Sequence, residues 1–404
     1  MFALLANNKA LAHLALYAAI TGVITSISML LAIPAGGIAS LCLLAILITK
    51  RPVLALAVWG VVYVTVSGLW VFPAFEGPIE CILGGLGLGI AGFVFYGGSG
   101  LISWLALRRA PVLILPVSLL LAEVTAASLG LVMAPIGLFA VDSALGAILA
   151  LVTVYGATAF FGLVAAILPH FTQRSFPIMF ASMMIVGLAP PLARPEYAGP
   201  PIFGISHRPD SVLKWSSSAY ASEMLYTLTE LSAGTAGAGL TVWPENSITN
   251  TFDLDEAVAS LDPDLLPLLF GMTRYARPSS PELRNSAVLV TAEGVQVSDK
   301  ELLVPVIETG MPFLDHSDLD VGIRDMLILD DGTKILPLIC YETAFMLTGS
   351  DLAGHPDVII ILAAEAGFAE GLAASIMRRH ARARELETGI RVDRVSDIGS
   401  EFTY

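Results

Sequence analysis

The stretch LPLICYETAF (residues 336–345) places Cys340, one of only three cysteines, at the end of an apolar run and directly before Tyr341 and Glu342. Such a run predicts a strand that is buried on both faces, as in a parallel sheet. A side chain at the end of a buried strand is held rigidly beside a loop that substrates can reach. Cys340 is therefore either a nucleophile at the edge of a sheet or a small packing residue.

The composition divides the chain into two unlike halves. Of the 404 residues, 55% are hydrophobic and 14% are charged, whereas an ordinary soluble domain has about 25% charged residues. Residues 1–193 hold six basic and four acidic residues, and the other 15 basic and 31 acidic residues follow them. We predict a membrane domain over 1–195 and a separate acidic domain over 196–404, whose negative charge argues against nucleic acid as a partner.

The first half can be divided into seven apolar segments, separated by connections rich in turn-forming or charged residues. A helix needs roughly 20 apolar residues to span a bilayer, and most of the segments approach that length. They cover about 11–30, 34–49, 53–73, 81–106, 111–132, 146–168 and 176–193.

The basic residues of this half predict an orientation. They occupy alternate connections, and the connections between them contain no lysine or arginine; the residues are Lys9, Lys50, Arg51, Arg108, Arg109 and Arg174. Basic connections stay in the cytoplasm. We therefore expect a multi-pass protein of a bacterial inner membrane, with its N-terminus in the cytoplasm and the domain after residue 193 in the periplasm.

Two features of the apolar half invite a functional interpretation. Glu123 lies inside the fifth segment, where an ionisable residue marks either a functional site or a carboxyl hydrogen-bonded to a neighbouring helix. The glycine-rich run GGLGLGIAGFVFYGGSG (84–100) resembles a phosphate loop only superficially, and we expect close helix packing there instead.

The second half alternates strands with helices, which predicts an α/β domain. Strands are expected at GLTVWPEN (239–246), NSAVLVTAEG (285–294), KILPLICYE (334–342) and DVIIILAAE (357–365). Helices are expected at 222–234 and 370–389, the second of which ends at Gly389.

Three reactive side chains follow the apolar runs of this domain: Glu245, Lys300 and Cys340. Together they form a set for acyl transfer, in which the carboxylate takes the thiol proton, the thiolate attacks a carbonyl and the ammonium stabilises the oxyanion. The residue types alone make this a weak signal, because a lone cysteine beside apolar residues is usually structural.

The motifs TVWPEN, SDKELLVPVIE and LPLICYET, followed by the stretch from ILAAEAGF to RVSDIGS, resemble the apolipoprotein N-acyltransferases in order and spacing. These are membrane members of the nitrilase superfamily. The resemblance covers nearly the whole chain. It implies seven membrane helices followed by a nitrilase-like (carbon–nitrogen hydrolase) α-β-β-α sandwich.

The resemblance also implies roles for individual residues. Glu245 matches the base, Cys340 the acylated nucleophile and Lys300 the lysine of the family's triad. Glu308 falls on a further essential glutamate, and Tyr341 and Glu342 on the tyrosine–glutamate pair after the cysteine. Glu342 has an alternative role as a structural ion-pair partner, and Glu308 as an ordinary acid of a surface loop.

The chain departs from the family pattern in three places. Ala363, Ala364 and Glu365 replace a Ser-Asn-Asp motif, and the start of the next helix differs around Ala373–Met377. The sequence ends at Tyr404, where the family continues into further strands and a last membrane helix. A shorter, diverged relative is expected, similar to the TraB branch that serves plasmid conjugal transfer.

The resemblance implies that Cys340 takes an acyl chain from a phospholipid and passes it to an amine, that of a lipoprotein or of a conjugation-apparatus protein. Two alternatives stay open: a non-catalytic scaffold of a transfer apparatus that keeps the fold, and an amidase. No pair of histidines has metal-ligand spacing, so we expect neither a metal nor another cofactor.

Overall fold

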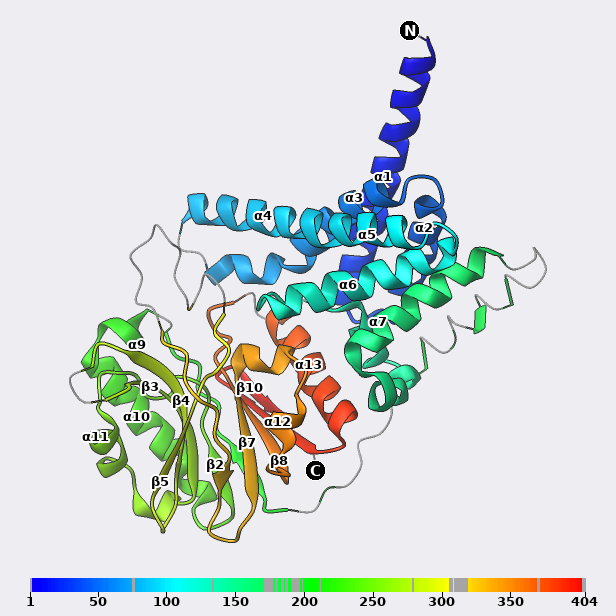
Figure 1. Ribbon diagram of the computed structural model, residues 1–404. Coiled ribbons are helices and arrows are strands. Elements are labelled where there is room, and N and C mark those ends of the chain that lie inside the picture. The colour runs from blue at the N-terminus through cyan, green and yellow to red at the C-terminus, as the bar shows by residue number, and fades with distance from the viewer. Residues whose placement is uncertain are drawn as a thin grey trace. The chain divides into compact units, whose positions relative to one another are not determined.

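The computed structural model describes residues 2–74, 77–132, 134–170, 177–178, 181–182, 185, 188–189, 197, 199–210, 212–277, 280–304, 308, 319–368 and 371–401 (Figure 1). The chain forms two compact units, Met1–Ala193 and Arg194–Tyr404. Each unit is described by itself.

The first unit is helical. Its α-helices are α1 (Phe2–Leu30), α2 (Pro34–Ile48), α3 (Pro52–Ser67), α4 (Pro78–Gly92), α5 (Gly98–Ala106), α6 (Ile114–Ser128) and α7 (Leu149–Ile167). Proline stands at the first position of α2, α3 and α4, where its fixed φ suits the helix and its missing N–H costs nothing. A short π-helix, Phe93–Gly97, joins α4 to α5 in one continuous helical stretch.

Four of these stretches are long and apolar enough to cross a membrane: Lys9–Leu30, Pro78–Ala106, Pro111–Ser128 and Ala144–His170. They correspond to four of the seven predicted segments. The second and third segments form apolar helices of 15 and 16 residues. The third is shorter than predicted because α3 ends at Ser67, before Gly68 and a 3₁₀ turn containing Pro73. The segment at 176–193 lies largely outside the described residues, so seven spans stay a prediction.

The glycine-rich run packs closely against α3. A Cβ built on Gly92 would lie 2.2 Å from the Gly60 carbonyl oxygen, so neither helix could come this near with a larger residue. Trp59 and Tyr96 pack beside this contact with their ring centroids 5.1 Å apart. The observed role of this run is helix packing, as predicted.

The second unit contains two five-stranded sheets. The first has the order β1 (Ile202–Gly204), β2 (Leu240–Val242), β3 (Leu268–Tyr275), β4 (Leu283–Val290) and β5 (Val295–Asp299). The second has the order β10 (Gly399–Glu401), β9 (Arg391–Ser396), β8 (Val358–Ala363), β7 (Lys334–Ile339) and β6 (Leu327–Ile328). Strands β1, β2 and β3 are parallel, as are β7, β8 and β9.

Three hydrophobic clusters show how the layers stack (Figure 1). The central cluster joins the sheets and includes Leu240 and Leu289 from the first with Ile339 and Leu362 from the second. The outer face of the first sheet packs on α10 (Ser218–Ser232) and α11 (Leu254–Ala259), and that of the second on α13 (Leu372–Thr388). The unit is therefore a helix–sheet–sheet–helix sandwich.

The carboxyl ends of the parallel strands carry the polar groups of interest. Glu245 follows β2, Cys340 follows β7, Glu365 follows β8 and Asp397 follows β9. Three of the predicted strands contain an observed one, and the strand predicted at 285–294 overlaps β4, which begins two residues earlier at Leu283. The chain leaves β2 and β7 before Glu245 and Cys340 instead of after them. Helix α13 ends, as predicted, at Gly389, whose φ of 70° is the left-handed conformation typical of a glycine after a helix.

Candidate active site

Cys340 occupies a sharp turn. It is the first residue of a 3₁₀ turn, Cys340–Ala344, and its φ is 51°, in the left-handed region that residues other than glycine rarely adopt. The side chain is partly buried against the core between the sheets. Backbone of this kind persists only where the surrounding structure enforces it, and it is often found at functional sites.

The Glu245 carboxylate is buried and held by three donors from different elements. Its Oε1 accepts hydrogen bonds from Lys300 Nζ at 3.1 Å and from Asn285 Nδ2 at 2.6 Å. Its Oε2 accepts one from the Ala364 N–H at 2.9 Å. The ends of β2, β5 and β8 and the start of β4 therefore converge on one carboxylate.

Lys300 has two carboxylate partners. Besides Glu245, its Nζ lies 2.6 Å from Glu308 Oε1, and the other oxygen of Glu308 accepts the Val304 N–H. Lys300 is fully buried; burial alone would lower its pKa, but the two carboxylates outweigh that effect and raise the pKa above its ordinary value. The lysine is therefore an ammonium ion at every physiological pH. The contact of Glu308 with Lys300 is not that of a surface-loop acid.

The Cys340 thiol is kept protonated. Burial, and next the negative charge of Glu245, raises its pKa well above the ordinary value, although the charge of Lys300 acts in the opposite direction. An ammonium that stabilises the oxyanion formed at Cys340 is expected to lie within hydrogen-bond reach of both Glu245 and the thiol. The first contact is present, but among the described residues no hydrogen bond joins Lys300 to Cys340, because the ammonium is directed to its two carboxylates.

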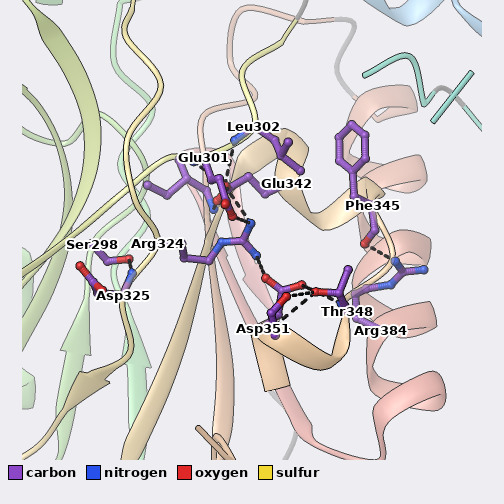
Figure 2. A network of polar contacts seen from close by, with 12 residues as sticks. Ser298, Glu301, Leu302, Arg324, Asp325, Glu342, Phe345, Thr348, Asp351 and Arg384 are labelled. Atoms are coloured by element: carbon purple, nitrogen blue, oxygen red, sulfur yellow. Dashed lines mark hydrogen bonds and ion pairs between the residues drawn. The ribbon is translucent and has the colours of Figure 1, made fainter. Parts of the chain in front are cut away.

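Glu342 links the cysteine turn to the lysine loop (Figure 2). Its Oε2 accepts the Ile339 N–H at 2.8 Å, and its Oε1 accepts the N–H groups of Glu301 at 2.8 Å and Leu302 at 3.2 Å. Arg324 lies 3.5 Å from the same carboxylate. These contacts are those of a structural ion-pair partner.

Arg324 extends this network to two further acids, Glu301 at 2.7 Å and Asp351 at 3.2 Å (Figure 2). Tyr341 is buried and packs edge-on against Phe345, with ring centroids 5.1 Å apart. The residues after Cys340 therefore fix the turn in place.

Sequence reasoning missed two groups that contact Glu245. Asn285 is fully buried near the start of β4, between Arg284 and Ser286, so its polar neighbours gave no sign that it would be buried. The Ala364 N–H belongs to the backbone, so its hydrogen bond to Glu245 could not be predicted from the residue type at position 364. Neither Arg324 nor Lys214 was singled out, although each is a basic residue in an acidic domain.

The segment that departs from the family pattern contains its own polar cluster. Glu365 is buried; its Oε2 pairs with Arg394 and accepts a hydrogen bond from Ser396 Oγ at 2.9 Å. Asp397 Oδ1 accepts the N–H groups of Glu365 at 2.7 Å and Ala366 at 3.2 Å. These contacts fix the loop after β8, whose Ala364 N–H binds Glu245.

The close approach of β3 to Glu245 yields a prediction. A Cβ on Gly271 would lie 2.4 Å from the Glu245 Cα, so Gly271→Ala should displace the carboxylate and reduce the free energy of unfolding by about 1–3 kcal/mol. Gly349→Ala is the matched control, because its Cβ would meet nothing within 4 Å. Denaturant unfolding of both variants checks the difference; equal stabilities would contradict the packing described.

Within the described residues, no group of three or more histidine, cysteine, aspartate or glutamate side chains could hold a metal ion. The structure brings the Glu245 carboxylate into contact with the Lys300 ammonium, and the charges of both act on the Cys340 thiol. The catalytic roles of these three residues stay a prediction.

Comparison with known proteins finds one partial sequence match among curated proteins. No family model matches the sequence. An "Apolipoprotein N-acyltransferase" of Azotobacter vinelandii (strain DJ / ATCC BAA-1303) is 27% identical over 206 residues, which cover 46% of this chain and 40% of the relative. The match therefore spans less than half of that relative's length.

Among solved structures, the carbon–nitrogen hydrolase from Helicobacter pylori G27 aligns with a TM-score of 0.31 and 13% identity. The alignment covers 50% of this chain and 73% of that one. The sequence match with the acyltransferase is therefore the comparison that bears on function.

Proposed function

We propose that this protein is a membrane-bound acyltransferase of the nitrilase type, with Glu245, Lys300 and Cys340 as its catalytic residues. The observation that carries the proposal is the buried Lys300 ammonium, which lies 3.1 Å from Glu245 in the α/β unit where the strained Cys340 turn also presents a thiol. Burial of an ion pair costs free energy, so a buried lysine–glutamate pair is more readily explained by a role in catalysis than by stability alone. The partial match with an apolipoprotein N-acyltransferase supports such a role.

In the first half-reaction, Glu245 takes the proton of the Cys340 thiol while the sulfur attacks the carbonyl carbon of a phospholipid ester. The Lys300 ammonium stabilises the oxyanion. When the tetrahedral intermediate collapses, the carbon–oxygen bond breaks, and the departing alkoxide takes the proton from Glu245 to become the hydroxyl of a lysophospholipid. The acyl group is left on sulfur as a thioester.

In the second half-reaction, an amine attacks the thioester carbonyl and loses a proton to Glu245. The carbon–sulfur bond breaks, and the thiolate recovers that proton, so an amide forms and the enzyme is regenerated. We propose the N-terminal amine of a lipoprotein, or an amine of a conjugation-apparatus protein in a TraB-like setting, as the acceptor. Glu308 holds the lysine, and Tyr341 and Glu342 hold the cysteine turn.

The test is complementation of a bacterium depleted of its apolipoprotein N-acyltransferase. We expect the wild-type chain to restore N-acylated lipoprotein and Cys340→Ala to fail, with both proteins present in the membrane in equal amounts. Restoration by Cys340→Ala would favour a scaffold. Release of free fatty acid without acylated lipoprotein would show that water, and not an amine, takes the acyl group, which would favour a hydrolase over an acyltransferase.

The proposed location is the inner membrane, with the N-terminus in the cytoplasm and the α/β unit in the periplasm. We expect alkaline phosphatase, which is active only outside the cytoplasm, to be active when fused after Arg194 and inactive when fused after Arg109. The physical reason is the retention of basic connections in the cytoplasm. The opposite pattern would contradict both the orientation and the proposed access to periplasmic lipoproteins.

A further inference from the structure

Lys214 is a buried cation that the mechanism does not use. It lies in the short helix α9 (Leu213–Ser216), and only 6% of its surface is exposed. Among the described residues, no carboxylate lies within 4 Å of its ammonium and no hydrogen bond from it is formed. Lys300 and Arg324, in contrast, each have at least two acidic partners. The side chain is recessed, but its ammonium nitrogen reaches the solvent and has no carboxylate at contact distance among the described residues. An anionic ligand that binds there would be its first charge partner at that distance.

Lys214 belongs to the same edge of the sandwich as the candidate active site. Strand β1 runs parallel to β2, and the Ile205 N–H donates to the Val242 carbonyl at 2.9 Å, so the chain leaves β1 beside the end of the strand that precedes Glu245. Burial lowers the pKa of Lys214, while the charges of Asp397 and Glu245 oppose this shift. Both carboxylates follow strands that end at this edge.

The helix that carries Lys214 is fixed in place. The Asp210 Oδ1 accepts the N–H groups of Val212 and Leu213, both at 2.9 Å, and the Asp210 N–H donates to the Tyr220 hydroxyl at 2.7 Å. The lysine therefore sits on a preorganised turn, which reduces the entropy lost when a ligand binds.

Apolar side chains surround this cation on the surface. Val212, Leu213 and Trp215 are 67%, 44% and 46% exposed, and the Lys214 ammonium lies 5.4 Å from the centre of the Trp215 ring. Exposed aliphatic and tryptophan side chains next to a recessed lysine match a ligand that has acyl chains beside an anionic group.

We propose that Lys214 binds the phosphate of the acyl-donor phospholipid and thereby positions its ester for attack by Cys340. This inference rests on the proposed function. A phosphodiester lies only a few bonds from the ester carbonyls of a glycerophospholipid, and a lysine binds phosphate as a point charge. The acceptor brings an amine, which the same lysine would repel. Val212, Leu213 and Trp215 contact the acyl chains.

The test measures binding and does not depend on turnover. Full-length Cys340→Ala protein in detergent is titrated calorimetrically with dihexanoyl phosphatidylglycerol, with dihexanoylglycerol, which lacks phosphate, and with inorganic phosphate. Lys214→Gln should raise the dissociation constant for phosphatidylglycerol at least tenfold, about the effect of losing one charge-assisted hydrogen bond. It should leave dihexanoylglycerol binding unchanged. Lys214→Arg should retain phospholipid binding, as should Lys334→Gln, which removes a lysine at the opposite end of β7.

Three results would overturn the proposal. Wild-type-like phospholipid binding by Lys214→Gln would show that the ammonium does not contact phosphate. An equal loss for both lipids would indicate a general structural role. Inorganic phosphate that binds as tightly as the phospholipid, with the same dependence on Lys214, would indicate a site for free anions. Because Cys340→Ala cannot be acylated, these results are independent of whether the protein transfers acyl groups.

Discussion

Glu245→Gln should slow the acylation of Cys340 by about 10²–10⁴-fold, the usual contribution of a general base. Glutamine has nearly the shape of glutamate and still offers an oxygen to the Ala364 N–H, but it cannot take the thiol proton. The rate is measured by intact-mass spectrometry as the acyl adduct accumulates with a phospholipid donor. An acylation rate equal to that of the wild type would exclude Glu245 as the base.

A second measurement on the same variant separates proton transfer from electrostatics. The charge of Glu245 raises the pKa of the Cys340 thiol, so Glu245→Gln should shift the pH profile of Cys340 alkylation to lower pH. The variant would then have a more acidic thiol and yet a slower acylation. Loss of acylation together with an unchanged alkylation profile would contradict the electrostatic environment described for Cys340.

Lys300→Met should destabilise the α/β unit by about 3–5 kcal/mol, because it leaves the buried carboxylate of Glu245 and the partly buried carboxylate of Glu308 without a counter-charge. It should also abolish acylation, since the oxyanion loses its ammonium. Denaturant unfolding of the detergent-solubilised protein measures the first effect, and the mass assay the second.

Two controls sharpen this prediction. Lys334→Met removes an amine that bonds to the Gly354 carbonyl near the surface and should change stability little. Adding Glu308→Gln to Lys300→Met removes one of the two carboxylate charges left without a partner and should recover part of the lost stability. A single Lys300→Met variant as stable as the wild type would mean that the three groups are not coupled.

The sequence predicted the elements whose pattern is local and strong. The apolar runs at 334–342 and 357–365 contain β7 and β8. The predicted helix end at Gly389 is also present, because glycine adopts the left-handed conformation after a helix with little strain. Strand ends were less predictable. The sharp turn at Cys340 is held in part by Glu342, two of whose partners, the N–H groups of Glu301 and Leu302, lie about 40 residues away in the chain.

The site was predictable only where a charged side chain met an apolar run. Glu245 and Lys300 have that signature, and Cys340 is a nucleophilic side chain in the same kind of place. Asn285 and the Ala364 N–H gave no such signal, since hydrogen bonds across a sheet depend on strand register. The orientation of the Lys300 ammonium toward two carboxylates, and away from a hydrogen bond with the thiol, is likewise a result of packing in three dimensions.

Intact-mass analysis of protein purified in its native lipid tests the central claim most directly. We expect an acyl adduct on Cys340 that hydroxylamine removes, because a thioester is cleaved more readily than an ordinary ester, and we expect none on a folded Cys340→Ala protein. If no adduct forms with any phospholipid offered, and Cys340→Ala keeps full biological activity, Cys340 is a packing residue and the protein is not an acyltransferase of this kind.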